Sequence, residues 1–177
     1  MKRRIAFGTV LAAVIALGAA MYAFAVPGAG AAGASSTATV STAMNMSVTG
    51  QRQGVFSKGA PITVLALSHE IVSPRDPASG LPTGQRQHRP ATVKVQWGST
   101  TPKFINALVT NENLTSVLIG LLRNGTKVAT IKLTNASVAH YVQTDDAVEL
   151  DMTYQKITWT WVAGGTTAQD DWGAPVP

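Results

Sequence analysis

The sequence predicts a mainly β protein: a small antiparallel β-barrel or sandwich with one flanking α-helix. Two observations predict the sheet. After residue 44 the chain is rich in β-branched residues, and its large apolar residues recur at every second position, which is the period of a strand with one buried face. A third observation, one short segment with helical spacing, predicts the helix. The 177 residues, 45% of them hydrophobic and 13% charged, leave room for one such domain.

An export signal is predicted at the N-terminus, in residues 1–33. Lys2, Arg3 and Arg4 precede an uncharged run of 22 residues, which is the order of segments in a secretory signal. Small residues near position 25 and at 31–34 offer two cleavage sites. An uncleaved run would anchor the chain, because about 20 apolar residues span a bilayer, and we expect no other membrane contact. In either case the rest of the chain is secreted from the cytoplasm, into the periplasm or the extracellular medium.

Behind the signal, a tether and a single domain are predicted. Residues 34–43 are small and uncharged, which is typical of a flexible tether, and the barrel domain is expected to occupy residues 44–177. The signal holds three of the 14 cations, so 11 remain against nine acids. Because the domain has no cluster of Lys and Arg, we predict no nucleic-acid partner.

A β-hairpin is the clearest local prediction. Residues 117–122 and 127–133 flank Asn124 and Gly125, a pair that favours a type I′ turn because both residues tolerate positive φ. Polar and apolar residues alternate in the second segment, which gives it one exposed and one buried face. Further strands are predicted at residues 44–49, 62–72, 91–97 and 137–142.

The longest predicted strand covers residues 147–162. Its apolar residues fall on even positions up to Tyr154 and on odd positions from Ile157. One extra residue near 155–156 must be absorbed, which predicts a β-bulge there. Bulges bend strands at the corners of barrels, so this strand is expected to turn such a corner.

The helix is predicted at residues 101–110. Thr101 is expected to be the N-cap, with Pro102 at the first helical position, where its missing N–H costs nothing. Phe104, Ala107 and Leu108 follow at the spacing of one helix face. That face is expected to pack against the barrel.

Residues 73–90 form a long segment that cannot belong to the core. The segment contains four prolines, two glycines and no apolar period. A loop of this length inside a compact domain is usually functional or disordered, and its prolines favour an extended arm over a flexible linker. We predict a docking surface for another chain, with Arg75, Asp76, Arg86 and His88 as candidate contact residues. The alternative is a solvated loop without a partner.

Residues with metal-binding or nucleophilic chemistry match no known motif. His69 and Glu70 begin like the zinc motif H-E-x-x-H, but Ser73 replaces the second histidine. His88 and His140 lie far along the chain. There is no cysteine and no serine in a G-x-S-x-G turn, which excludes a thiolate site and that class of nucleophile. We predict no metal, no cofactor and no catalytic residue.

Two pairs of neighbouring carboxylates, Asp145-Asp146 and Asp170-Asp171, are the candidates for a catalytic acid and base. Neighbours in sequence point to opposite faces of a strand, so neither pair forms an obvious dyad. Both pairs are predicted to be solvated turn residues. These observations together predict that the protein is not an enzyme.

Three tryptophans lie near the C-terminus. Trp159 and Trp161 share one face of the longest predicted strand, and Trp172 lies just beyond it. Such a row can stack sugars or bases. Without surrounding cations, we instead favour packing in the core or at a subunit interface.

Three motifs carry a resemblance to a known family. They are the segment SPRDPASGLPTGQRQHRP at 73–90, the strand YQKITW at 154–159 and the ending DDW at 170–172. In combination they resemble the Hcp family, the haemolysin-coregulated tube proteins of type VI secretion. The likeness covers residues 44–176.

The resemblance implies a compact β-barrel with a flanking helix that assembles into six-membered rings, which stack into a hollow tube. It implies that residues 73–90 reach a neighbouring subunit or ring, and that the lumen carries effectors. Spike and sheath proteins of the secretion machine are the other partners it implies. One feature departs from the family pattern, because members of the family carry no cleavable export signal.

The leading hypothesis is a structural, self-assembling subunit that forms hexameric rings, and the rings stack. The alternative is a secreted monomeric binding module that holds a carbohydrate, a peptide or an effector. The two differ in the assembly state of the mature protein.

Overall fold

The computed structural model describes residues 40–172 of the chain, so the predicted signal and most of the tether lie outside the described residues. Its elements are β1 (Thr42–Gly50), β2 (Gly54–Val55), β3 (Ile62–Ser68), β4 (Ile71–Val72), β5 (Gln87–His88), β6 (Ala91–Gln96), α1 (Thr101–Val109), β7 (Leu114–Arg123), β8 (Thr126–Thr144), β9 (Ala147–Trp161) and β10 (Thr166–Asp171). The mainly β class and the single flanking helix are confirmed.

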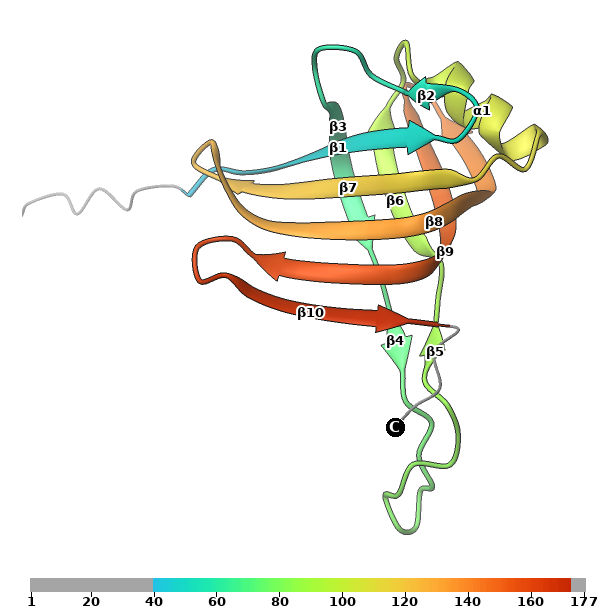
Figure 1. Ribbon diagram of the computed structural model, residues 1–177, viewed down its shortest axis with the longest axis vertical. Helices are drawn as coiled ribbons and strands as arrows, with labels where there is room; N and C mark the ends of the chain where they lie inside the picture. The colour runs from blue at the N-terminus through green and yellow to red at the C-terminus, as the bar shows by residue number, and fades with distance from the viewer. Residues whose placement is uncertain (1–39, 173–177) are drawn as a thin grey trace, which may run out of the picture. The chain divides into compact units, whose positions relative to one another are not determined.

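Six strands close into a barrel in the order β9-β6-β3-β1-β7-β8, because β8 pairs again with β9. All these pairings are antiparallel. In Figure 1, β1, β7, β8, the second half of β9 and β10 run side by side in this order, and β3 and β6 cross behind them. β10 extends the sheet beside β9, whereas β4 and β5 form a separate two-stranded sheet below the barrel.

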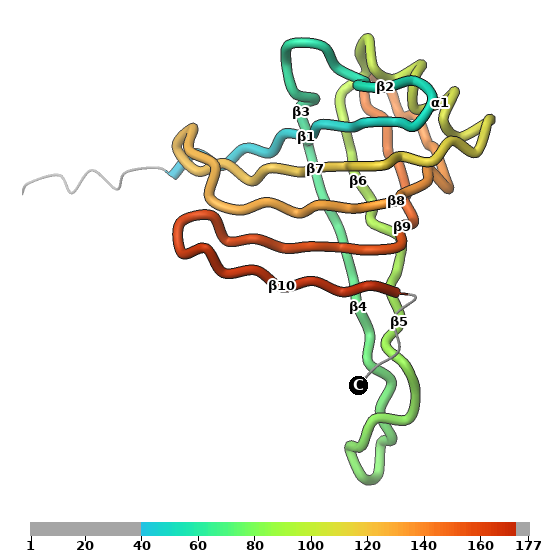
Figure 2. Tube along the Cα trace, viewed as in Figure 1, coloured from blue at the N-terminus to red at the C-terminus, as the bar shows by residue number. Residues whose placement is uncertain are grey.

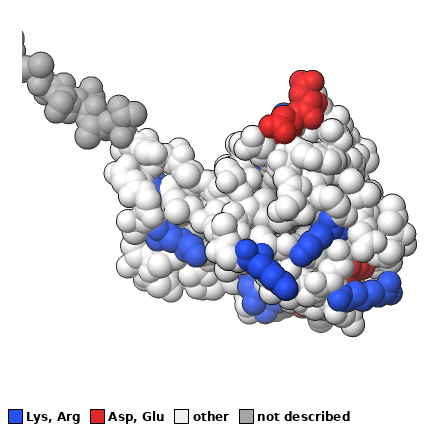
Figure 3. Space-filling model, turned by 90° about the horizontal axis from the view of Figure 1, so that it is seen from above, with Lys and Arg blue, Asp and Glu red and all other residues white. Residues whose placement is uncertain are grey.

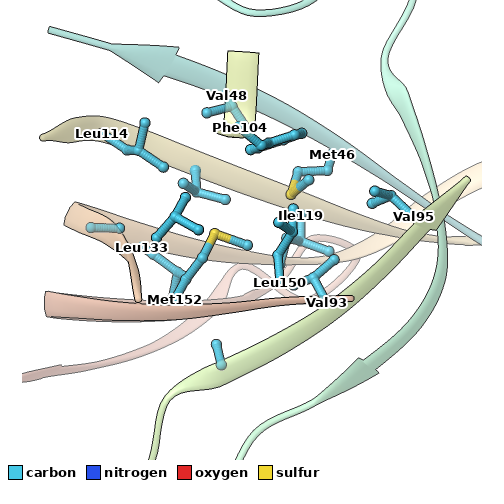
Figure 4. Close-up of a cluster of buried hydrophobic side chains, with 14 of the residues drawn as sticks. Met46, Val48, Val93, Val95, Phe104, Leu114, Ile119, Leu133, Leu150 and Met152 are labelled. Carbon is cyan, nitrogen blue, oxygen red and sulfur yellow. The ribbon is translucent and has the colours of Figure 1, made fainter. Parts of the chain in front are cut away.

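The barrel encloses one apolar core, to which alternate residues of each strand contribute. Phe104 reaches from α1 into this core, and its ring lies 5.1 Å from that of Phe56 between centroids. Figure 4 shows Phe104 above the side chains of the sheet. The largest fully buried apolar side chains are Phe104, Met46, Leu114, Ile119, Leu133, Leu150, Met152 and Ile157.

The predicted hairpin is confirmed. β7 and β8 are joined by Asn124 and Gly125, whose φ angles are +50° and +76°. Both values are those of a type I′ turn, whose twist matches the twist of the strands it connects. The turn therefore fixes the register in which β7 and β8 begin to pair, with Arg123 opposite Thr126.

The predicted β-bulge at 155–156 is wrong. On either side of that point Ala136 pairs with Tyr154 and Thr134 pairs with Lys156, without a shift of register. Instead, β8 and β9 both change the face that they turn to the core at the same point, at Asn135 (φ +50°) and Gln155. There the Asn135 side-chain amide donates to Gln155 Oε1 at 2.8 Å. The register of β8 and β9 shifts farther along, between Val138 and His140 of β8.

Three predicted strand boundaries differ from the structure. The segments at 127–133 and 137–142 belong to one strand, β8, because the chain passes through Asn135 without losing its pairing to β9. The segment at 62–72 is split into β3 and β4, and β1 begins at Thr42, within the predicted tether. In each case pairing across strands decides the boundary.

The N-cap and the first helical residue each lie one position earlier in the sequence than predicted. Thr100 is the N-cap residue and Thr101 the first helical residue, so Pro102 is the second. The Thr100 side chain makes no capping hydrogen bond. Thr101 is buried, and its Oγ1 accepts from the Gly98 N–H at 3.0 Å. The predicted threonine cap is therefore wrong, because Thr101 holds the preceding turn.

A buried carboxylate, Glu112, holds the turn between β1 and β2. Its Oε1 accepts from the backbone N–H groups of Arg52 and Gln53 at 2.7 and 2.8 Å, and its Oε2 accepts from the Gln53 amide at 2.7 Å. Gly50 is required beside it, because a Cβ there would lie 2.4 Å from Oε1. Burial alone would raise the pKa of Glu112, but the hydrogen bonds from Gln53 and Arg52 outweigh burial and lower it.

Replacing this carboxylate is expected to destabilise the barrel. The amide of Glu112→Gln keeps one oxygen for the two backbone N–H groups but turns its NH2 toward the donating side-chain amide of Gln53. The loss of that acceptor and of the negative charge is expected to lower the free energy of unfolding at pH 7 by about 1–3 kcal/mol. Because the pKa of Glu112 is lowered in the folded state, its stabilising contribution is lost as the pH falls below the usual value of 4.5. Urea unfolding at several pH values should therefore show the two proteins converging in acid.

Glu149→Gln is the matched control, since Glu149 is exposed on β9. We expect it to change the free energy of unfolding by no more than about 0.5 kcal/mol. Equal losses in the two variants would contradict the role assigned to Glu112.

Candidate functional site

The predicted arm, residues 73–90, projects from the barrel as a long hairpin (Figure 2). β4 and β5 form its base, where Ile71 pairs with His88 and Val72 pairs with Gln87. Nearer the tip, the Thr83 N–H donates to the Pro74 carbonyl at 3.0 Å. The arm is thus held in shape by its own backbone and extends beyond the surface of the barrel.

The tip of the arm is a tight turn built on Asp76. Its Oδ1 accepts from the backbone N–H groups of Ala78 and Ser79 at 2.9 and 2.7 Å, and the hydrogen bonds from Ser79 are the main reason that the pKa of Asp76 is lowered. The Arg75 guanidinium donates to the Gly80 carbonyl at 3.1 Å. Leu81, beside this turn, is 65% exposed. The tip therefore presents an apolar side chain on an ordered support.

The other two predicted contact residues lie at the base of the arm and contact the barrel. Arg86 forms an ion pair with Asp170 of β10, and it also donates to the Asp171 carbonyl at 3.0 Å. His88 is buried, with its Nε2 2.6 Å from the same Asp170 oxygen. Arg86 and His88 are thus in contact with their own chain, whereas Arg75 and Asp76 lie at the free end.

Tyr154 of β9 connects this base to the barrel. Its hydroxyl lies 2.9 Å from His88 Nδ1 and is also hydrogen-bonded to Nε2 of His69, which precedes β4. We call His69, Arg86, His88, Tyr154 and Asp170 the anchor cluster. The cluster joins three parts of the chain that lie far apart in sequence: the arm, β9 and β10.

The position of the cluster follows from the way β9 changes partners. β9 pairs with β6 up to Met152 and with β10 from Lys156. Tyr154 lies between these two stretches, where no strand of the described part of the chain pairs with that edge of β9. The base of the arm fills the place, and Trp172 closes it with a backbone hydrogen bond to the Gln155 carbonyl at 2.9 Å.

Burial and neighbouring charge set the protonation of the cluster. Burial and then the charge of Asp170 raise the pKa of Tyr154 to about 12, so its hydroxyl is neutral. Burial would raise the pKa of Asp170, but hydrogen bonds from Arg86 and His88 outweigh it and lower the value. Burial, and after it the proximity of His88, lower the pKa of His69.

The predicted aromatic set divides between this cluster and the free surface. The Trp172 ring lies 5.4 Å from the His88 ring, and the Trp159 ring lies 5.9 Å from the His69 ring, between centroids. Trp159 also packs against the core. Trp161 lies two residues beyond Trp159 on β9 and is 44% exposed.

The predicted role of Asp170 as a solvated turn residue is wrong, because its carboxylate accepts from Arg86 and His88. Asp145 and Asp146 do lie in an exposed turn, between β8 and β9. Sequence reasoning missed the anchor cluster because 82 residues separate His88 from Asp170. The sequence feature that could have indicated this contact is the joint occurrence of the arm motif at 73–90 and the Asp-Asp-Trp ending at 170–172.

Within residues 40–172, no three His, Cys, Asp or Glu side chains are grouped so that they could hold a metal ion. In the same part of the chain, no helix has the length and apolar character needed to cross a membrane. What the anchor cluster can do is orient the arm and pass a proton along a row of hydrogen bonds.

Removing the shared carboxylate is expected to loosen the arm. In Asp170→Asn the ion pair with Arg86 is lost and one hydrogen bond to His88 is weakened, so hydrogen-exchange protection of β4 and β5 should fall about tenfold or more. The barrel strands β1 and β7 should keep their protection. Asp145→Asn, a change in the exposed turn, is the control, and an equal effect in both variants would refute the anchoring role.

Comparison with known proteins places this structure in a family. The family described as "Type VI secretion system effector, Hcp" matches residues 38–161. The curated "Major exported protein" of Pseudomonas aeruginosa is 32% identical over an alignment 173 positions long, and the alignment covers 77% of this chain and 99% of that protein.

Solved structures agree with the sequence comparisons. A crystal structure of an Hcp protein is 25% identical, covers 73% of this chain and 99% of its own, and has a TM-score of 0.66. The secreted protein Hcp3 from Pseudomonas aeruginosa is 26% identical, covers 76% of this chain and all of its own, and also has a TM-score of 0.66. The chain therefore belongs to the Hcp family of type VI secretion proteins.

Proposed function

We propose that this chain is an exported structural subunit that associates with copies of itself into six-membered rings, and that the rings stack into a tube. The observation that carries this proposal is the arm. A long hairpin is held away from the barrel at one end and fixed to it at the other, in a chain of a tube-protein family. Such a projection has the form of a contact with a neighbouring subunit.

The order of the arm supports a docking role. A flexible loop loses conformational entropy when it becomes ordered on binding, and this loss weakens the binding. A loop that is already ordered loses less entropy. Here the Asp76 turn, the Arg75 contact and the β4–β5 pairing fix the arm before any partner binds. Arg75 and Asp76 are the proposed docking residues, and Arg86 and His88 are proposed to position them.

The sheet offers further surfaces for self-association. Within residues 40–172, β10 pairs with β9 along one edge and with no strand along the other. An unpaired edge is a template for pairing with another chain. A contact between two different surfaces of the same chain closes into a ring when its rotation permits, and otherwise continues as a filament.

The charge distribution is compatible with close approach of copies. Figure 3 shows Lys and Arg as separate groups on the face seen from above, with acidic residues gathered on one projection and uncharged surface between them. No field of one sign covers this face, so repulsion between like faces is small.

We extend the proposal to location and partners. The predicted signal supports export of this chain, and the exported relative supports a final position outside the cytoplasm, in the periplasm or the medium. Spike and sheath proteins and effector cargo are the further partners proposed. The proposed role is structural and involves no catalysis, metal or cofactor.

A second candidate function is a monomeric binding module. The observation that favours it is an apolar hollow on the extended part of the sheet, lined by Leu121, Ala129, Ile131, Trp159 and Trp161. Tryptophans beside an open hollow can stack a sugar or hold an apolar side chain of a peptide. Assembly state separates this candidate from the first.

The decisive experiment is the mass of the purified mature protein by light scattering, with negative-stain images of the same sample. Six-membered rings would support the proposal. A monomer at high concentration would reject it and favour the binding module, which tryptophan fluorescence on addition of oligosaccharides or peptides then tests.

Variants of the arm tip are expected to weaken assembly without unfolding the barrel. Arg75→Ala and Asp76→Ala each remove a contact that shapes the tip, so the concentration needed for assembly should rise about tenfold or more. The thermal midpoint of the isolated subunit should stay unchanged, since the tip contributes nothing to the core.

Lys58→Ala is the matched control, because it removes an exposed charge from the loop between β2 and β3, at the end of the barrel opposite the arm (Figure 1). It should assemble as the unaltered protein does. If Arg75→Ala or Asp76→Ala unfolds the subunit, the docking assignment is wrong.

A further inference from the structure

The two histidines of the anchor cluster share one hydroxyl. His69 Nε2 and His88 Nδ1 are both hydrogen-bonded to Tyr154 Oη, and their ring centroids lie 6.3 Å apart. On its other side, His88 Nε2 faces Asp170, which also receives Arg86. The five groups form a continuous row from His69, through Tyr154 and His88, to Asp170 and Arg86.

We infer that the anchor cluster is a proton-operated latch, which holds the arm against β9 and β10 at neutral pH and releases it in mildly acidic solution. The release follows from the contacts described here. Its consequence for ring assembly rests on the proposed function.

At neutral pH every group in the row has a partner. Asp170 is ionised and only accepts, so His88 Nε2 carries a proton and donates to it. His88 Nδ1 then accepts the hydroxyl proton of Tyr154. The Tyr154 oxygen in turn accepts from His69 Nε2. The side chain of His88 is 1% exposed, and both of its ring nitrogens have partners within the protein.

One added proton can be accommodated. When His88 becomes an imidazolium, its Nδ1 donates to the Tyr154 oxygen, and the Tyr154 hydroxyl rotates to donate to His69 Nε2. His69 then carries its own proton on Nδ1, which it can exchange with solvent because the residue is half-buried. The number of satisfied hydrogen bonds is unchanged, and Asp170 faces the new charge.

A second proton cannot be accommodated. With both rings charged, His69 and His88 both donate to the same oxygen, and the Tyr154 hydroxyl proton has no acceptor left. A donor without a partner inside a protein is costly, and the two imidazolium rings repel each other. The contacts of the arm's base must therefore break for the second proton to bind.

The titration of His69 points the same way. Its pKa is lowered from the usual 6.5, first by burial and then by the charge of His88. A histidine whose pKa is lower in the anchored state binds protons better once released. The contribution of His69 to the stability of the anchored arm is therefore fully present above pH 6.5, and it is lost progressively as the pH falls below that value.

Other charged groups near the cluster lie outside the row. Glu70, which precedes β4, and Arg89 of the arm form an exposed ion pair at 2.8 Å. Asp151 of β9 accepts from Thr92 of β6 at 2.6 Å. Asp171 lies beside Asp170 at the end of β10, and its carbonyl accepts from Arg86.

His140 of β8 is the third histidine among residues 40–172, and it lies outside the row. Its Nδ1 lies 3.3 Å from Asp151, and its side chain is 61% exposed. Since it contacts neither Tyr154 nor the arm, it provides the control: His140→Gln removes a histidine charge without altering the row.

The test is hydrogen exchange of the mature protein at pH 7.5 and pH 5.0, with protection factors corrected for the intrinsic effect of pH. We expect protection of β4 and β5 to fall about tenfold or more at pH 5.0, while β1 and β7 keep theirs. Trp172 fluorescence should change over the same range, because its ring lies on that of His88. Unchanged protection of β4 and β5 would overturn the inference.

The key variant is His69→Gln, which can donate to Tyr154 but cannot acquire a charge. It should keep the arm protected at both pH values, whereas His140→Gln should behave as the unaltered protein. A full response to acid in His69→Gln would refute the latch. If this variant instead loses protection already at pH 7.5, histidine proton resonances of the unaltered protein decide: His69 must titrate together with the amides of β4 and β5, and independent titration refutes the latch.

The same samples separate this inference from the proposed function. Rings absent at both pH values reject the proposed function, whereas loss of arm protection in acid still supports the latch. Rings that persist in acid after the arm has lost protection would overturn the link between latch and assembly.

Discussion

The structure depends on one constraint: β9 must serve two neighbours along a single edge. Its first half completes the barrel by pairing with β6, and its second half leaves the barrel and pairs with β10. Between them β9 turns its other face to the core, so that Tyr154 and then Ile157 point inward. A strand in that position leaves backbone groups exposed at the change of partners. The base of the arm and Trp172 cover this place, so the barrel and the arm are determined together.

Buried polar groups secure both ends of the barrel. Glu112 holds the β1–β2 turn near α1, and the anchor cluster holds the arm beside β10. Within residues 40–172 no buried side-chain nitrogen or oxygen lacks a hydrogen-bond partner. Loss of a partner is costly at Glu112 and at His88, because both side chains are buried from water. The apolar core lies between them, so disturbance of the arm need not reach it.

The sequence was sufficient wherever a local pattern decides the structure. Asn124 and Gly125 determine their turn by backbone preference, and alternation of apolar residues identifies the strands because each strand has one buried face. The same reasoning misplaced the cap of α1, since the fold uses Thr101 to hold a turn. It also misread the change of phase in β9 as a bulge. The sequence of β9 alone cannot show that the partner strand β8 changes its inward face at the same point, at Asn135 opposite Gln155.

The anchor cluster lay beyond local reasoning for a physical reason, and that reason bears on function. His69, His88, Tyr154 and Asp170 come from separate elements, so each looks isolated along the chain, and only the closed barrel brings them into one row. Contacts of this kind hold a projecting element without adding to the core. The arm can then be released or held with the barrel intact, because its free energy of opening is separate from that of global unfolding. A subunit that must dock through a projecting hairpin gains from this separation, since the strength of docking can change while the fold does not.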